Sequence, residues 1–285
     1  MSSKSKKSGQ QPESVQFANE DGSAIFSLYE NSEYEIEVIR PADGQAISKA
    51  MIRPDSKHRT FSISLEEGLP AQVDTVELLS LWIRELVTKK ADSDLQTRLE
   101  WKNGTEKSDP KTLRWVAGGR LEELVFRVLR VFKGTVFDDV VWNGKTGEWG
   151  LPTPAQKISE QTGKKLPDIM AFQGNNVYVV ETTLLRGRAQ WNQEAASVPD
   201  HIEDARKTYR DKSVSGVFIA PKIEAKTQTI LVTVGRDNDY RVVPLEVEEF
   251  LKIVVSIETG GKDAWEHNLA TLWSVLKRSA VQAKP

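Results

Sequence analysis

The segment that most constrains this chain is a pair of apolar runs flanking Gly174-Asn175. A Gly/Asn dipeptide between two alternating apolar runs predicts a β-hairpin with a two-residue turn. The register of that turn places Asp168 directly opposite Glu181. Opposed residues point to the same face of a sheet, with Cβ atoms about 4.5–5.5 Å apart. The hairpin therefore predicts two carboxylates side by side, with Tyr178 and Val180 on the other face.

Predicted strands and helices alternate on both sides of the hairpin, from residue 111 to the end of the chain. This alternation predicts a mixed α/β or α+β domain with a central sheet. Gly118-Gly119 are expected to precede a helix, and Pro199 is expected to start a new one. The expected helices are 120–133, 245–256 and 264–279, together with a helical region over 188–212 that Pro199 divides. The other expected strands are 137–142, 214–221, 227–234 and 240–245.

The first part of the chain has a different pattern. Short, partly alternating runs between residues 14 and 68 are separated by Gly, Asn, Pro and Asp, which is typical of a small antiparallel β module. Thr75 opens a predicted helix of about four turns, and Lys90 to Pro110 is polar like a linker. The expected organisation is a disordered basic tail (1–13), a β-rich module with one helix (14–110) and a second domain (111–285).

Composition excludes several classes of site. The 285 residues contain no cysteine, which rules out disulfides, a thiolate nucleophile and Cys-ligated metal sites. No apolar run reaches about 18 residues, and the basic N-terminal tail lacks the apolar stretch of a secretory signal. We expect a cytoplasmic protein without a membrane partner.

Charge is unevenly distributed along the chain. The net charge of −2 conceals 25 basic and 22 acidic residues from Lys111 onward, while the preceding part is acidic. Affinity for phosphates depends on the local patch rather than the total. The second domain is therefore not excluded from binding nucleic acid.

The paired carboxylates indicate a metal site. Two close carboxylates repel one another, and a divalent cation between them would relieve that repulsion. Oxygen ligands suit a hard ion such as Mg²⁺ or Mn²⁺. A third acid, Glu122, flanks the apolar face of the helix at 120–133, whereas Glu123 lies nearly opposite that face. The alternative is that these acids are solvated, with Glu122 interacting only with the helix dipole.

These residues resemble a known family. The pattern Gly-x-Leu-Glu, Pro-Asp, hairpin and Glu-x-x resembles the PD-(D/E)xK nuclease fold, with Thr183 in the position of the lysine. The continuation VETTLLRGRAQWNQEAASVPDH resembles the AlwI-type cleavage domain of type IIS restriction and nicking endonucleases. That family has Glu-x-Thr, Gly-Arg-x-Gln, a Glu and a His at the spacing of Glu181, Gln190, Glu194 and His201. The resemblance covers about residues 113–254 and implies a restriction-endonuclease-like domain with a mixed central sheet.

The resemblance also implies roles. Glu122, Asp168 and Glu181 would hold Mg²⁺ together with the backbone carbonyl of Thr182, and Glu194 and His201 would complete the site or orient the attacking water. Since Thr183 replaces the lysine, His201 becomes the candidate proton acceptor because its pKa lies near neutrality. For Glu194 and His201 the alternatives are a surface acid and a structural histidine.

The residues after the hairpin are candidate nucleic-acid contacts. Arg186, Arg188 and Gln190 follow it directly, and arginine can bind phosphate with two parallel hydrogen bonds. A solvated turn is the alternative. Trp191 could stack on a base, although packing is the simpler role. The apolar residues of the last helix predict a core or oligomer contact: Trp265, Leu269, Leu272, Trp273 and Leu276.

Three functional hypotheses follow. The first is an Mg²⁺-dependent endonuclease acting on double-stranded DNA, in restriction or phage defence. The second is a catalytically weak nuclease-fold subunit that binds DNA or assembles with a separate recognition protein, and the third is an interaction protein with surface acids only. One PD-(D/E)xK centre cuts one strand per visit, so double-strand cleavage would need a homodimer or a second cutting subunit. The front module is smaller than the recognition module usual in the family.

Overall fold

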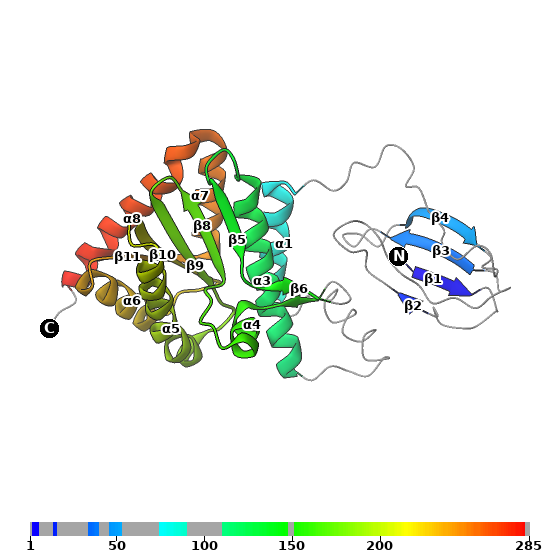
Figure 1. Cartoon of the computed structure of the whole chain (residues 1–285), viewed down its shortest axis with the longest axis horizontal. Coiled ribbons are helices and arrows are strands. Elements are labelled where there is room, and N and C mark those ends of the chain that lie inside the picture. Colours follow the sequence, from blue (N-terminus) through cyan, green and yellow to red (C-terminus); the bar gives the residue numbers. More distant parts are fainter. Residues whose placement is uncertain are drawn as a thin grey trace. The chain divides into compact units, whose positions relative to one another are not determined.

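The computed structural model describes residues 2–5, 14–15, 34–39, 46–52, 74–89, 110–147 and 151–282. The chain divides into two compact units. The smaller unit is formed by Met1–Val73, Ser93–Ser108 and Gly147–Leu151, and the larger one by Asp74–Asp92, Asp109–Thr146 and Pro152–Pro285. The predicted site residues all belong to the larger unit. Figure 1 shows the chain coloured along its sequence.

The larger unit is built on a five-stranded mixed sheet in the order β11-β10-β9-β8-β5. β9, β10 and β11 are parallel, whereas β8 is antiparallel to both β9 and β5. A small two-stranded sheet pairs β6 with β7. The strands are β5 (Asp139–Trp142), β6 (Lys145–Thr146), β7 (Pro152–Thr153), β8 (Ile169–Gln173), β9 (Asn176–Thr182), β10 (Ser213–Ala220) and β11 (Arg241–Glu246).

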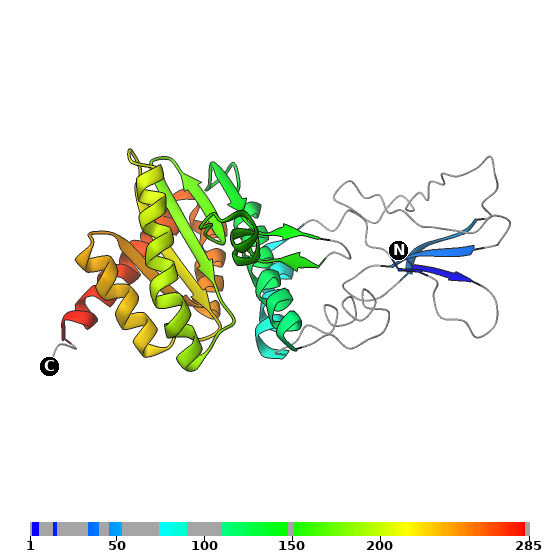
Figure 2. The ribbon, with the colours of Figure 1, turned by 60° about the horizontal axis from the view of Figure 1, so that its bottom comes forward.

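Helices cover both faces of this sheet (Figures 1 and 2). On one face, α1, α3, α7 and α8 share a large apolar core with the sheet, whereas α5 and α6 form a second core on the other face. The result is a three-layer α/β/α domain with a mixed sheet. The helices are α1 (Val76–Lys89), α3 (Pro110–Val131), α4 (Ala155–Thr162), α5 (Gly187–Thr208), α6 (Ala225–Asp237), α7 (Val247–Gly260) and α8 (Lys262–Gln282).

The hairpin register predicted from the sequence is confirmed. Gln173 pairs with Asn176, and the same register continues to Ile169 and Val180. Gly174 has a φ of 56°, a left-handed conformation that glycine adopts without strain. Tyr178 and Val180 point into the larger core, whereas Val177 and Val179 point into the second core, as the alternation predicted.

The smaller unit contains a four-stranded sheet in the order β2-β1-β3-β4. Its strands are β1 (Ser2–Ser5), β2 (Ser14–Val15), β3 (Tyr34–Ile39) and β4 (Ala46–Ile52). The expectation of a disordered tail over residues 1–13 is wrong for Ser2–Ser5, because this segment pairs antiparallel with β3 through its backbone. The runs SAIFSLY and RTFSISL, also expected to be strands, lie outside the described residues.

Helix α1 packs with the larger unit rather than the smaller one. Its buried side chains Val76, Leu79, Ile83 and Leu86 belong to the same core as α3 and the sheet. This placement differs from the expected division near residue 110, which assigned the helix to the front module. The polar segment after the helix suggested a domain boundary there. The apolar face of α1 nevertheless packs against α3 in the core of the larger unit.

Two expected elements differ from the observed ones. The segment 227–234, rich in threonine and valine, was expected to be a strand but forms most of α6. β10 and β11 are parallel neighbours, and a parallel pair needs a crossover connection, which this helix supplies. Helix α3 also begins about ten residues earlier than expected, at Pro110, and runs through Gly118-Gly119.

Helix α5 is continuous through Pro199, where a new helix was expected. A proline inside a helix removes one backbone hydrogen bond and costs about 3 kcal/mol. The buried side chains Val198, Ile202 and Ala205 hold the helix against the sheet on both sides of the proline. Packing therefore outweighs the local cost, and the helix presents one continuous face.

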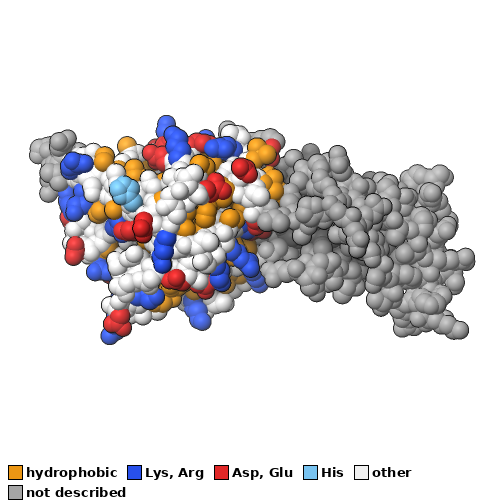
Figure 3. Space-filling view, turned by 90° about the horizontal axis from the view of Figure 1, so that it is seen from above, with side chains coloured by type: hydrophobic (Ala, Val, Ile, Leu, Met, Phe, Trp, Pro, Cys, Tyr) orange, Lys and Arg blue, Asp and Glu red, His pale blue; other side chains and the backbone are white. Residues whose placement is uncertain are grey.

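No helix within the described part of the chain is long and apolar enough to cross a membrane. On the face of the larger unit seen in Figure 3, basic and acidic side chains are intermixed with hydrophobic ones. That face has no extended area of a single charge.

The predicted cluster on the last helix is part of the core. Trp265 is fully buried and makes edge-to-face contacts with Phe137 and Tyr178. We expect Trp265→Ala to lower the free energy of unfolding by about 3–5 kcal/mol, because it leaves a large cavity. Val275→Ala, on an exposed position of the same helix, should change it by less than about 0.5 kcal/mol. Urea denaturation of both variants measures the difference, and equal decreases would contradict the assignment of Trp265 to the core.

Candidate active site

The predicted acids meet at the end of the central sheet where β9 ends and β8 begins, close to α4 (Figure 1). Asp168 directly precedes β8, and Glu181 is the penultimate residue of β9. Both side chains are buried, with 8% and 5% of the residue exposed. The hairpin register thus brings the two carboxylates to one edge, as expected from the turn.

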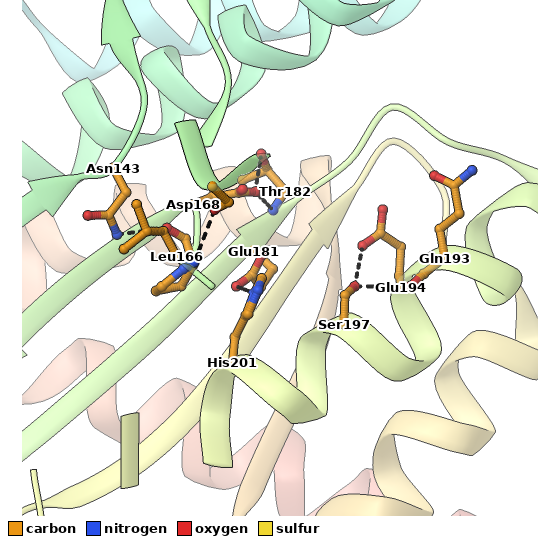
Figure 4. A network of polar contacts seen from close by, with 11 residues as sticks. Asn143, Leu166, Asp168, Glu181, Thr182, Gln193, Glu194, Ser197 and His201 are labelled. Carbon is orange, nitrogen blue, oxygen red and sulfur yellow. Dashed lines mark hydrogen bonds and ion pairs between the residues drawn. The ribbon is translucent and has the colours of Figure 1, made fainter. Parts of the chain in front are cut away.

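Asp168 is held by contacts from Thr182 and Asn143 (Figure 4). Its Oδ2 accepts hydrogen bonds from the backbone N–H of Thr182, at 2.7 Å, and from the Thr182 hydroxyl, at 3.3 Å. Asn143 donates its backbone N–H to the Asp168 carbonyl and its side-chain amide to the Pro167 carbonyl. The Pro-Asp dipeptide is therefore fixed between the ends of β5 and β9.

Glu122 reaches the same edge from α3. It is 5% exposed, and its Oε2 accepts hydrogen bonds from the backbone N–H of Ala155, at 2.8 Å, and from Nε1 of Trp142, at 3.2 Å. Gly119, one turn earlier, permits this approach, because a Cβ there would lie 3.0 Å from the backbone nitrogen of Pro154. Close packing of α3 against the segment before α4 thus sets the position of Glu122.

Helix α5 contributes Glu194, Ser197 and His201 from successive turns of one face (Figure 4). His201 Nδ1 lies 2.6 Å from Oε1 of Glu181, and the Ser197 hydroxyl donates to Oε2 of Glu194 at 3.3 Å. The sequence alone did not place Glu194 and His201 on one face, because Pro199 was expected to interrupt the helix. The uninterrupted helix brings both toward the end of β9.

Thr183, which the sequence resemblance aligned with a lysine, is 6% exposed. Its backbone N–H donates to the carbonyl of Ile219 in β10, and its hydroxyl hydrogen-bonds to Glu194 and accepts the N–H of Leu185. The side chain therefore orients Glu194 and the following loop instead of supplying a positive charge.

Mutual repulsion and burial dominate the electrostatics of the site. Burial raises the pKa of Glu122 to about 7, opposed by the hydrogen bonds from Ala155 and Trp142. Burial, then the neighbouring charges of Glu122 and Glu181, raise the pKa of Asp168 well above its usual range. Burial and the charges of Glu194 and Glu122 act on Glu181 in the same direction, raising its pKa. Burial and neighbouring negative charge therefore disfavour the simultaneous ionisation of these acids.

His201 and Glu194 respond to the same environment. Burial lowers the pKa of His201 below its ordinary value of 6.5, although the charges of Asp200 and Glu194 oppose that shift, so the ring is neutral at pH 7. When Glu181 is ionised, a neutral imidazole donates Nδ1–H to it and keeps Nε2 as an acceptor. Burial raises the pKa of Glu194, opposed by the hydrogen bonds from Thr183 and Ser197.

Over the described ranges, no group of three or more His, Asp and Glu side chains is already arranged to hold a metal ion. The hydrogen bonds described above engage one oxygen each of Glu122, Asp168 and Glu181. The second oxygen of each carboxylate is not used in those bonds. The donor chemistry therefore suits a hard divalent cation, but the side chains do not form a closed shell.

The candidate nucleic-acid contacts separate into two kinds. Arg186 and Arg188 are exposed, and Arg186 donates to the carbonyl of Val87. Gln190, in contrast, is fully buried: its Nε2 donates to the carbonyls of Leu185 and Lys222, and its Oε1 accepts the N–H of Glu224. The expectation that Gln190 contacts nucleic acid is wrong in this structure, because the side chain joins two loops from the inside.

Sequence reasoning missed the residues that support the acids. These are Trp142, the last residue of β5, Asn143, which follows it, and Ala155, whose backbone N–H begins α4. The only local signal was that Trp142 ends an apolar strand. Trp142 and Glu122 are 20 positions apart in the chain. Trp142 reaches the site because β5 pairs with β8, and no pattern within either strand predicts that pairing.

Residues 155–253 match the AlwI restriction endonuclease family. This chain contains an AlwI-family restriction endonuclease domain. The matched residues include Asp168, Glu181, Glu194 and His201, whereas Glu122 precedes them. No curated protein matches the chain.

Several solved structures are similar to the chain. One is the small subunit, R.BspD6I2, of the heterodimeric restriction endonuclease R.BspD6I, with 18% identity and a TM-score of 0.46 over 64% of this chain and 89% of that one. The restriction endonuclease FokI matches with 14% identity and a TM-score of 0.37, over 66% of this chain and 31% of FokI. FokI bound to DNA matches with 12% identity and the same TM-score, over 78% and 37% of the two chains.

The pKa of Glu122 predicts a pH-dependent effect on stability. Because the folded-state pKa of about 7 exceeds the ordinary value of 4.5, the stabilisation from this group is complete below about pH 4.5 and is lost as the pH rises through 7. Glu122→Gln keeps a side-chain oxygen for both hydrogen bonds and removes the charge. We expect its stability relative to the unsubstituted protein to improve by about 2–3 kcal/mol between pH 5 and pH 8.

Urea denaturation in EDTA at the two pH values tests this expectation. Glu258→Gln, at an exposed position of α7, is the matched control and should show no such improvement. An equal difference between Glu122→Gln and the unsubstituted protein at both pH values would rule out a buried acid with a raised pKa.

Proposed function

We propose that this chain is a divalent-metal-dependent DNA endonuclease of the restriction type, acting in restriction or phage defence. The observation that carries the proposal is the burial of Glu122, Asp168 and Glu181 at the end of β9, with the partly buried Glu194 and His201 beside them. All of these residues except Glu122 lie inside the AlwI-family match. Buried acids that raise one another's pKa are unfavourable as a purely structural device. They are typical of a site that performs chemistry.

Mg²⁺, or Mn²⁺, is the cation that the donor set fits. Carboxylate oxygens and a backbone carbonyl are the ligands these hard ions prefer, and a cation would relieve the repulsion between the acids. Glu122, Asp168 and Glu181 would hold it with the carbonyl of Thr182. When bound, such an ion withdraws charge from a phosphoryl oxygen and lowers the pKa of a coordinated water.

The side chains around the acids would perform the remaining work. His201 would accept a proton from the attacking water at Nε2, while Nδ1–H remains hydrogen-bonded to Glu181, 2.6 Å away. Thr183 and Ser197 would hold Glu194 in the orientation needed to position that water. Thr182 would keep Asp168 facing the reacting group.

The replacement of lysine by Thr183 favours one alternative function. Without that positive charge, the domain would be a weak nuclease that binds DNA and assembles with a separate recognition protein. Under either function, one centre would cut one strand, so a double-strand break would need a homodimer or a second cutting subunit. R.BspD6I is described as heterodimeric, and the smaller unit of this chain is a candidate module for recruiting such a partner.

The primary test is nicking of supercoiled plasmid DNA by the full chain with Mg²⁺ or Mn²⁺. Asp168→Asn and Glu181→Gln should abolish nicking, because each removes a charge from the metal site, and His201→Gln should slow it by about 10²–10⁴-fold. Asp211→Asn, at an exposed position after α5, should leave the rate unchanged. A parallel assay with structured RNA establishes whether DNA is the preferred substrate.

The outcomes separate the two functions. Nicking that persists in both Asp168→Asn and Glu181→Gln would show that this site is not the active site. Binding of DNA without nicking, under both metals and with added partner fractions, would favour the weak-nuclease subunit.

Trp142 provides a second prediction about the metal. Trp142→Phe keeps a ring to stack on Phe126 but removes the N–H that holds Glu122. Loss of such a supporting hydrogen bond costs about 10–100-fold in metal affinity. Isothermal titration with Mg²⁺ should show this loss, whereas Trp273→Phe, remote from the acids, should not. Equal affinities for Trp142→Phe and the unsubstituted protein would mean that the hydrogen bond does not orient Glu122.

A further inference from the structure

The structure assigns the path of the nucleic-acid backbone to one side of the acids, across a basic cluster of Arg188, Lys222 and Lys226. The cluster lies where α5 and α6 begin, next to the strand ends that carry the site. We infer that these three cations bind substrate phosphates flanking the cleaved bond, an inference that rests on the proposed nuclease function. Lys222 and Lys226 were not recognised from the sequence.

The topology brings the basic cluster to the same sheet edge as the acids. β9 and β10 are parallel neighbours with Thr182 opposite Ile219, so both strands end at this edge. The N–H of Thr183 donates to the carbonyl of Ile219 at 3.0 Å, which keeps the two chain segments together as they leave the sheet. Arg188 follows the first strand by a short loop, and Lys222 follows the second.

Buried hydrogen bonds fix the two loops against each other. Gln190 connects the carbonyls of Leu185 and Lys222 through one side-chain nitrogen, with bonds of 3.0 and 2.9 Å. In the reverse direction, Glu224 accepts the N–H of Gly187 at 2.9 Å. Gly187 has a φ of 58°, which a side chain would make unfavourable. Because the Gln190 side chain is buried and bonded to both loops, it holds the backbone that carries Arg188 and Lys222 in place.

The positive charges of the basic cluster are not paired with acidic side chains in salt bridges within the described part of the chain. Arg188, Lys222 and Lys226 are exposed, and none forms a salt bridge with a described residue. The nearby acids Glu224 and Glu246 accept backbone N–H groups at Gly187 and Ile223. These positive charges are therefore accessible to an external anion.

The opposite side of the site differs in this respect. On α4 and the loop after it, Lys157 is paired with Glu160, and Lys165 is paired with Asp200 of α5. These two lysines already have acidic partners, whereas Lys164, in the same loop, is exposed and forms no salt bridge with a described residue. A polyanion approaching the site would therefore meet one unpaired lysine on this side and three unpaired cations at the start of α5 and α6.

An aromatic ring fixes one of the cations. The Lys226 amine lies 3.5 Å from the centroid of the Trp191 ring, a cation–π contact, and Trp191 is one helical turn before Glu194. The ring thus links a member of the basic cluster to the helix that carries part of the site. Contacts from arginine and lysine to phosphates carry no sequence information, so the inference concerns the position of the nucleic-acid backbone and not the recognition of particular bases.

Salt-dependent binding tests the inference. The full chain in EDTA is titrated against a fluorescent DNA duplex over a range of KCl concentrations, and nicking with Mg²⁺ is measured on the same preparations. The triple variant Arg188→Gln/Lys222→Gln/Lys226→Gln should bind more weakly. The slope of log K against log[salt] should become shallower by about 0.9 for each phosphate that the variant no longer neutralises, or about 3 in total. Its plasmid nicking should slow at low DNA concentration and recover as DNA approaches saturation.

The charge-matched control is Lys252→Gln/Lys262→Gln/Lys277→Gln, on exposed positions of α7 and α8. Its salt slope should equal that of the unsubstituted protein. An unchanged slope in the basic-cluster variant, or equal decreases in both triple variants, would overturn the inference while nicking by the unsubstituted protein still supports the nuclease function. Absence of both binding and nicking in the unsubstituted protein would overturn the proposed function, and this inference with it.

Discussion

Three buried acids and a fourth, partly buried one repel one another at the end of the central sheet, and the surrounding residues are arranged around that repulsion. Burial raises the pKa of all four acids, and the charge of Glu194 raises the pKa values of Glu122, Asp168 and Glu181 further. Such an arrangement persists only if the surrounding structure holds the side chains in place. The hydrogen bonds from Thr182, Trp142 and Thr183 supply that support.

The fold supplies these acids from three layers. The sheet carries Asp168 and Glu181, α3 delivers Glu122 from one face, and α5 delivers Glu194 from the other. The large core on one side and the smaller core on the other hold the helices in position, so the packing far from the acids determines their separation. The same parallel strands that end at the site also place the loops that carry the basic cluster.

Local patterns were sufficient where the interacting residues are close in sequence. The tight turn at Gly174 sets the pairing of β8 with β9, and the helical apolar pattern identifies Glu122 as the inward-facing acid of its pair. Local patterns failed where tertiary structure outweighs propensity. The threonine- and valine-rich segment of α6 becomes a helix because it must connect two parallel strands, and Pro199 remains inside α5 because the helix packs on both sides of it.

The hairpin, the candidate acids and the family resemblance could be predicted from the amino-acid sequence, because they depend on turn chemistry, side-chain period and short spacings. The three-dimensional packing was needed to show that Glu194 and His201 share one helix face, that the Gln190 side chain is buried between two loops and that Trp142 hydrogen-bonds to Glu122. It also decided that α1 belongs to the core of the larger unit. These outcomes depend on contacts between segments far apart in the chain, whose relative positions are set by packing rather than by any local pattern.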